Sequence, residues 1–183
     1  MTFRMNDQEI YQLVKMFKDA TVSARDAGQF RNDISFYNFP KGCCGDTCYL
    51  LATFLLLYEI ETIYVCGTHG NQSHAWLVLN DSRVKQPTPE FYYPENEYVQ
   101  ILEKYGIESG GPIEHTRYKA RDLTYGLVID ITADQFGEPS VYVCNRNDFY
   151  RKFKFDFAHA CNGVDNSRLK NLYDRIVAFL PTQ

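Results

Sequence analysis

The sequence predicts a single α+β domain in which helices pack on a mostly antiparallel sheet. Three observations support this class. Residues 7–27 have the apolar spacing of an amphipathic helix, residues 44–58 predict a second helix that is apolar on nearly every side, and strand-like segments follow from residue 62 onward. This order, two helices and then strands, is typical of α+β folds. The 183 residues suffice for one domain with a substantial core, so we assign 1–183 to a single domain.

The predicted helices have recognisable boundaries. Asn6 or Asp7 can cap the first helix, and Gly28 ends it. The second helix begins near Cys44. Because its leucines fall on nearly every side, we expect it to be buried at the centre of the fold. A third helix, amphipathic in pattern, is predicted within residues 165–180.

The strands are predicted by short runs of alternating or continuous apolar residues. These runs are residues 62–67, 73–79, 126–132 and 140–144. The link "GTHGNQS" between the first two is typical of a hairpin turn. Residues 80–123 interrupt this rhythm with prolines, a Gly-Gly pair and one helical piece, "NEYVQILEKYG". We expect this insertion to lie over one face of the sheet and to act as a lid or specificity element.

Composition excludes several classes of protein. The net charge is -4 and the longest basic block is the short "RKFK", so we expect no nucleic-acid partner. The longest mostly apolar run, residues 49–58, is about half of the ~20 residues that a membrane span requires. The N-terminus "MTFRMNDQEI" has no apolar core of a secretory signal. We therefore expect a cytoplasmic protein without a membrane partner.

Six cysteines do not have the pattern of a disulfide framework or of a zinc site. A chain of this size without a signal is expected to keep its thiols reduced. The run "CCGDTC" lacks the CxxC pairing and the second pair of ligands that zinc sites use. We therefore expect neither a metal nor an organic cofactor.

The stretch "FPKGCCGDTCYLLATFLLLYE" places two cysteines at the start of the buried helix. A thiol at a helix N-terminus meets unpaired N–H groups and the positive end of the helix dipole, which favour the thiolate. Cys44 directly precedes Gly45 and is the preferred nucleophile, whereas Cys48 lies one turn further along and is expected in the core. Inert packing thiols, or a redox-sensing pair formed by Cys43 and Cys44, are the alternatives.

A reactive thiolate needs a histidine, and the histidine needs a group that orients it. His74 opens the strand "SHAWLVL", and Asp130 lies within "GLVIDIT", where a buried carboxylate requires a partner. Three further residues are candidates for contact with substrate or for oxyanion stabilisation: Gln72, Trp76 and Gln135. A structural histidine beside the tryptophan is the alternative for His74.

This order of residues resembles the transglutaminase-like branch of the papain-like cysteine protease superfamily. The resemblance covers residues 39–58, 62–79 and 126–144, and the pattern "FPxGxCGD…SHAWL…IDITADQF" is also similar to small bacterial proteins. It implies a papain/transglutaminase-like core, with Cys44 as nucleophile, His74 as base and Asp130 as the residue that orients it. The last two are 56 positions apart (74 to 130), so the match requires that the insertion leave their strands paired.

These observations predict a cysteine-dependent acyl-transfer enzyme that acts on an amide of a protein or peptide. A Cys-His-Asp triad would form a thioester, and the acyl acceptor would make the protein a peptidase, a deamidase or a transglutaminase. Two alternatives stay open. One is a small-molecule acyltransferase of the arylamine N-acetyltransferase kind, and the other is a binding module that has the same fold without chemistry.

Overall fold

The computed structural model describes residues 5–87, 90–92, 113–115 and 118–181. Its helices are α1 (Asp7–Asp26), α2 (Cys44–Leu56), α4 (Asp148–Arg151) and α5 (Ser167–Val177), with 3₁₀ turns η1 (Ala120–Leu123) and η2 (Ala133–Phe136). Its strands are β1 (Thr62–His69), β2 (Gln72–Leu79), β3 (Glu90–Tyr92), β4 (Ile113–His115), β5 (Leu127–Asp130), β6 (Tyr142–Asn145) and β7 (Lys154–Cys161). The helical piece predicted within residues 96–106 lies outside the described residues.

The main sheet has five strands in the order β6-β5-β2-β1-β7, and all of its neighbouring strands are antiparallel. A separate two-stranded ladder joins β3 to β4. The α+β class is therefore confirmed. Among the described residues, no helix is both long and apolar enough to cross a membrane.

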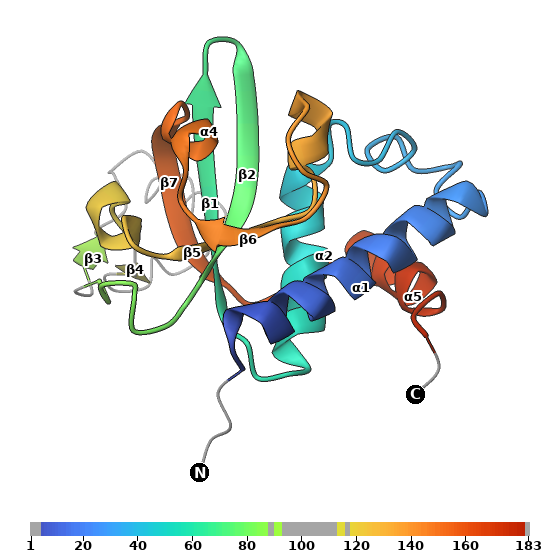
Figure 1. The fold of residues 1–183 in the computed structure, drawn as a ribbon, viewed down its shortest axis with the longest axis horizontal. Coiled ribbons are helices and arrows are strands. Elements are labelled where there is room, and N and C mark those ends of the chain that lie inside the picture. Colours follow the sequence, from blue (N-terminus) through green and yellow to red (C-terminus); the bar gives the residue numbers. More distant parts are fainter. Residues whose placement is uncertain (1–4, 88–89, 93–112, 116–117, 182–183) are drawn as a thin grey trace, which may run out of the picture.

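Helix α2 occupies the centre of the helical layer (Figure 1). It packs against β2 on one side and against α1 and α5 on the other, as expected of a helix that is apolar on nearly every side. Leu50, Leu51 and Leu55 are almost fully buried. The expectation was wrong for Leu56 and Leu57, which are 37% and 69% exposed, because the C-terminal end of the helix reaches solvent.

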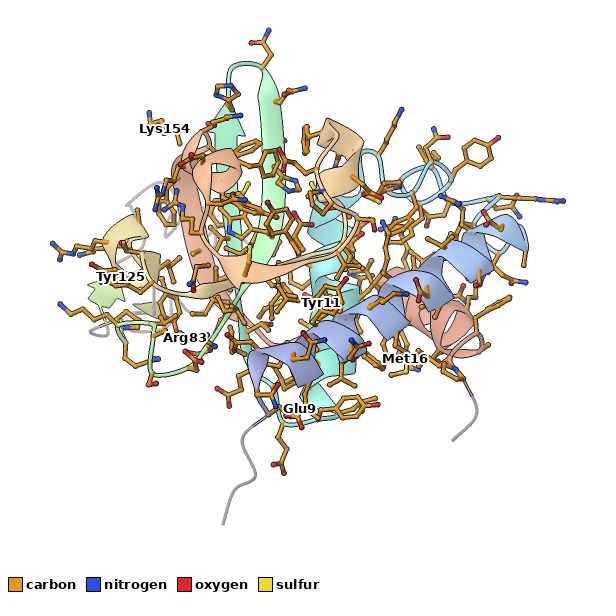
Figure 2. All side chains as sticks on the ribbon, in the orientation of Figure 1. Glu9, Tyr11, Met16, Arg83, Tyr125 and Lys154 are labelled. Carbon is orange, nitrogen blue, oxygen red and sulfur yellow. The ribbon has the colours of Figure 1, made fainter. Side chains whose placement is uncertain are left out.

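Local signals in the sequence define the ends of α1. The side chain of Asn6 accepts hydrogen bonds from the N–H groups of Gln8 and Glu9, and the Glu9 carboxylate accepts one from the Asn6 N–H. This reciprocal arrangement is a capping box, which satisfies N–H groups that have no partner within the helix. Arg83, in the segment after β2, donates two hydrogen bonds to Asp7 and so connects that segment to the start of α1 (Figure 2).

The two faces of the sheet have separate cores, because successive side chains of a strand point to opposite faces. On β2, Ala75 and Leu77 face the helices, whereas Trp76 and Val78 belong to a second apolar cluster on the other face. That cluster is completed by residues from both described ends of the insertion and from the region of α4: Val84, Tyr118, Leu123, Phe149, Tyr150 and Phe153. The described ends of the insertion therefore pack on one face of the sheet.

The fifth strand, β7, is absent from the sequence prediction. Seven of its eight residues pair with β1 at the edge of the sheet, and a register shift lies between Cys66 and Gly67 of β1. Its sequence, "KFDFAHAC", does alternate, but half-exposed aromatic residues take the place of the aliphatic run that marks an inner strand. The other four strands agree with the prediction within a few residues at each end, the largest difference being the shorter β5.

Candidate active site

The first pair of predicted site residues meets where β5 lies beside β2. Leu77 and Val78 of β2 pair with Ile129 and Val128 of β5, so the insertion leaves the two strands side by side. This pairing brings His74 and Asp130 together: the His74 Nε2 lies 2.7 Å from the Asp130 Oδ2. Both side chains are buried, with 0% and 3% exposure.

Four donors surround the Asp130 carboxylate. Its Oδ2 accepts hydrogen bonds from His74 and from the Tyr150 hydroxyl, at 3.0 Å for the latter. Its Oδ1 accepts from the Thr132 N–H at 2.7 Å and from the Thr132 hydroxyl at 2.9 Å. Burial alone would raise the pKa of Asp130, but the hydrogen bonds from His74 and Thr132 outweigh it and hold the pKa below its usual range. Asp130 is therefore a carboxylate that orients the imidazole.

The Cys44 thiol, at the first residue of α2, lies close enough to His74 and to the Ala75 N–H of β2 to interact with both. The His74 Nδ1 is buried and has no hydrogen-bond partner among the residues that the structure describes. The ring thus has its Nε2 on Asp130, and its Nδ1 is available to a further partner.

The charges of Cys44 and His74 stabilise each other. Burial alone would raise the pKa of Cys44, but the interaction with His74 and the nearby Ala75 N–H lower it below its usual value. Burial alone would lower the pKa of His74, but Asp130 and Cys44 raise it to about 9. Both shifts favour a thiolate–imidazolium pair.

The direction of the pKa shift separates Cys44 from the other five thiols. Cys43 is only 2% exposed, its sulfur accepts a hydrogen bond from the Thr47 hydroxyl at 3.6 Å, and desolvation raises its pKa to about 12. Desolvation also raises the pKa of Cys48, which lies in the core. The thiol pKa is raised in the three remaining cysteines as well: Cys66, Cys144 and Cys161. Cys44 is thus the one cysteine of the six whose pKa is lowered.

The start of α2 has no side-chain cap. Its N-cap residue, Cys43, makes no side-chain cap, so the first N–H groups of the helix, starting with that of Cys44, have no cap partner. Gly42 has a φ of +73°, a conformation that glycine adopts without strain and that turns the chain into the helix. A Cβ on Gly45 would lie 3.3 Å from the Tyr64 hydroxyl, so glycine also permits close packing of this turn on β1.

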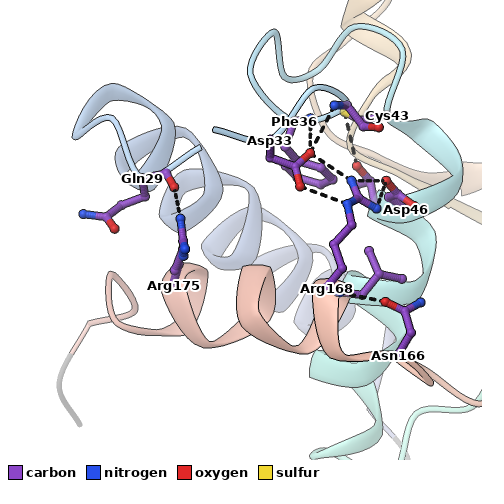
Figure 3. A network of polar contacts seen from close by, with 11 residues as sticks. Gln29, Asp33, Phe36, Cys43, Asp46, Asn166, Arg168 and Arg175 are labelled. Carbon is purple, nitrogen blue, oxygen red and sulfur yellow. Dashed lines mark hydrogen bonds and ion pairs between the residues drawn. The ribbon is translucent and has the colours of Figure 1, made fainter. Parts of the chain in front are cut away.

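Ion pairs anchor this end of α2 to the rest of the fold (Figure 3). Arg168 of α5 donates to the Asp46 carboxylate in the first turn of α2 at 2.9 Å, and to the Asp33 carboxylate at 2.8 and 2.9 Å. Asp33 in turn accepts from the N–H groups of Ser35 and Phe36, in the segment that leads to the cysteines. One arginine thus joins α5, α2 and the preceding loop.

The three residues predicted to contact substrate lie in different settings. Trp76 is 3% exposed and packs on Tyr150 with ring centroids 5.3 Å apart, so its place is the second core and not a substrate surface. Gln72 is exposed at the end of the hairpin. Gln135 is intermediate in exposure between Trp76 and Gln72. Its Nε2 donates to the Thr132 carbonyl at 2.9 Å, and its Oε1 accepts from the Gly42 N–H at 3.4 Å.

Three supporting residues were not found by sequence reasoning. Thr132 had a local signal, because an aspartate side chain commonly accepts a hydrogen bond from the N–H two residues further along the chain. Tyr150, which lies 20 residues beyond Asp130, had none. Lys18 is buried in α1 and donates to the Ile131 carbonyl at 2.7 Å and to Asp134 at 2.9 Å, so it holds the segment that follows Asp130. Its partners are more than 100 residues away, and no local pattern reveals them.

Within the described part of the chain, no group of three or more His, Cys, Asp or Glu side chains is arranged to hold a metal ion. Comparison of the chain with protein-family models, with curated proteins and with solved structures gave no match.

Proposed function

We propose that this protein is a cysteine-dependent acyl-transfer enzyme with a papain-like, transglutaminase-like core, and that it acts on an amide. The observation that carries the proposal is the buried His74 ring, which has a carboxylate on its Nε2, an unpartnered Nδ1 among the described residues, and the partly exposed Cys44 thiol close enough to interact with it. Two features strengthen it: Cys44 starts the central helix, and it is the one cysteine whose pKa is lowered. A packing thiol would have a raised pKa, as Cys43 has.

In the first half of the reaction, the Cys44 thiolate attacks the amide carbonyl carbon and a C–S bond forms. Negative charge moves to the carbonyl oxygen, where the unpaired N–H groups at the start of α2 are donors of the right kind. The His74 imidazolium passes its Nδ1 proton to the leaving nitrogen as the C–N bond breaks. The products are a thioester on Cys44, a free amine or ammonia, and a neutral His74.

In the second half, neutral His74 takes a proton from water or from an amine as that acceptor attacks the thioester. The C–S bond breaks, and the thiolate–imidazolium pair is restored. Water gives hydrolysis of a peptide bond or deamidation, whereas an amine gives a new amide bond. Throughout both halves, Asp130 holds the ring orientation and stabilises its positive charge through the 2.7 Å hydrogen bond.

Alkylation of the native protein by iodoacetamide across roughly pH 5 to 9 tests the ion pair, since this range brackets the ordinary thiol pKa of about 8.5. Each site is followed by mass spectrometry. We expect Cys44 alone to react near pH ~6 in the wild type and to require pH ~8.5 in His74→Ala. His159→Ala is the matched control, because His159 bonds to Tyr49 and the Ala160 carbonyl instead.

Turnover is the second half of this test. Release of an amine or ammonia from peptide amides should be lost in Cys44→Ala, while the circular dichroism spectrum of the variant matches that of the wild type. Wild-type Cys44 that stays unreactive until pH ~8.5 would refute the enzyme proposal and leave a binding module whose cysteines serve packing.

A further inference from the structure

A groove of about 380 Å³ lies beside the candidate active site. It is bordered by the end of the β1–β2 hairpin, by η2 and by the segment around α4, which surround the upper part of β2 (Figure 1). Its apolar floor consists of Phe136, Phe149 and Phe153, and Gln72 and Lys152 are among the polar residues at its rim.

The floor of the groove is also the cover of His74. The ring centroids of Phe136, Phe153 and Phe149 lie 5.0, 5.5 and 6.0 Å from that of the imidazole. One side of this aromatic cluster therefore packs on the candidate base, while the other side lines the groove. A ligand on the floor would lie next to the rings that cover the His74–Asp130 pair, and it would further exclude water from that pair.

One wall of the groove contacts the loop before α2. Gln135 lines the groove, and the Gln135 Oε1 accepts a hydrogen bond from the N–H of Gly42, two residues before Cys44. This contact links the groove to the segment that carries the candidate nucleophile.

The lining of the groove indicates what kind of ligand it suits. Three phenylalanine rings favour a flat apolar side chain, since stacked or edge-to-face aromatic contacts add to the gain from burial. Among the described lining residues, Lys152 is the only lysine or arginine, and Glu138 supplies an opposing carboxylate. A site for the phosphates of an acyl-CoA would need concentrated positive charge, whereas amide and mixed-sign rim groups suit a peptide backbone.

We propose that the groove binds the acyl side of a peptide substrate and takes an aromatic side chain next to the reacting carbonyl. The proposal rests on the function proposed above, because it assumes that Cys44 is the nucleophile. It adds a substrate class: peptides with an aromatic residue at the carbonyl side of the amide that is attacked.

The test compares two chloromethyl ketones that have the same reactive group, acetyl-phenylalanyl and acetyl-glycyl chloromethyl ketone. Their second-order rate constants for Cys44 are measured at pH 7 by mass spectrometry. We expect the phenylalanyl probe to react at least about tenfold faster, the discrimination that an apolar pocket typically provides. In Gln72→Trp, which places a large ring at the rim, the ratio should fall toward one.

Gln12→Trp is the matched control, since it makes the same substitution in a separate groove formed by α1 and the C-terminal segment. It should keep the wild-type ratio. Equal rates with both probes in the wild type, or an unchanged ratio in Gln72→Trp, would overturn the groove proposal while the proposed function stands. Protection of Cys44 by coenzyme A would overturn it in favour of the acyltransferase alternative. Failure of both probes to label Cys44 would instead count against the proposed function.

Discussion

The hydroxyl of Tyr150 offers a direct way to separate stability from reactivity at this site. Tyr150 is fully buried, and its hydroxyl donates to the Asp130 Oδ2 at 3.0 Å, the same oxygen that accepts from His74. Tyr150→Phe removes one donor from a buried carboxylate and keeps the ring that packs on Trp76. The change therefore isolates a single hydrogen bond.

The expected loss in the free energy of unfolding follows from the charge of Asp130 and from the burial of the Tyr150–Asp130 hydrogen bond. A hydrogen bond to a charged group contributes about 1.5–3 kcal/mol. We expect the lower part of this range, about 1.5–2 kcal/mol, because Asp130 keeps three donors from His74 and Thr132. For a domain of this size, each kcal/mol lowers Tm by roughly 2–4 °C, so Tm should fall by roughly 3–8 °C.

Urea unfolding and thermal melts measure this loss, and Tyr173→Phe is the control. The Tyr173 hydroxyl is buried without a hydrogen-bond partner in the described part of the chain, so its removal should cost little. We expect Cys44 in Tyr150→Phe to keep its reactivity below the ordinary thiol pKa of about 8.5, because the Asp130–His74 contact persists. Loss of that reactivity with unchanged stability would refute this reasoning, since the Tyr150 hydroxyl would then affect the His74–Asp130 pair and not the free energy of unfolding.

Three further predictions concern the same region. A His74 pKa of about 9 gives stability that is complete below 6.5 and lost as pH rises toward 9, whereas the lowered Cys44 pKa gives stability that grows over this interval. These trends oppose each other in the wild type. Cys44→Ala removes the Cys44 trend and leaves Asp130 to raise the His74 pKa, so in urea unfolding its stability should fall more steeply than that of the wild type as pH rises above 6.5. Cys43→Ala should leave the pH profile of Cys44 alkylation unchanged, because the Cys43 thiol, with a pKa of about 12, stays protonated; a shifted profile would contradict its assignment to packing. Arg168→Gln should destabilise the fold by about 1 kcal/mol and raise the pH of half-maximal Cys44 labelling, because the carboxylate in the first turn of α2 loses its counter-ion. Arg175→Gln on the same helix should leave that pH unchanged, and equal shifts in both variants would rule out this local charge effect.

Local sequence patterns were sufficient for most elements of the fold. The 3.6-residue spacing of apolar side chains predicts α1, α2 and α5, and alternating or continuous apolar runs predict the strands β1, β2, β5 and β6. These patterns succeed because they record which side of an element is buried. The edge strand β7 was missed because one of its sides faces solvent and it lacks a long apolar run.

The sequence by itself determined the types and order of the candidate site residues: a cysteine at a helix start, a histidine early in one strand and an aspartate within another. It also favoured Cys44 over Cys43, and the tertiary structure adds a physical difference between them: Cys43 is packed in the core, whereas Cys44 is partly exposed. The tertiary structure also shows that Trp76, which the sequence suggested as a substrate contact, is buried in the core. The physical reason is that these interactions join segments far apart in the chain. Strand register and helix docking determine how each side chain packs and which charged groups it meets, and no local pattern encodes them.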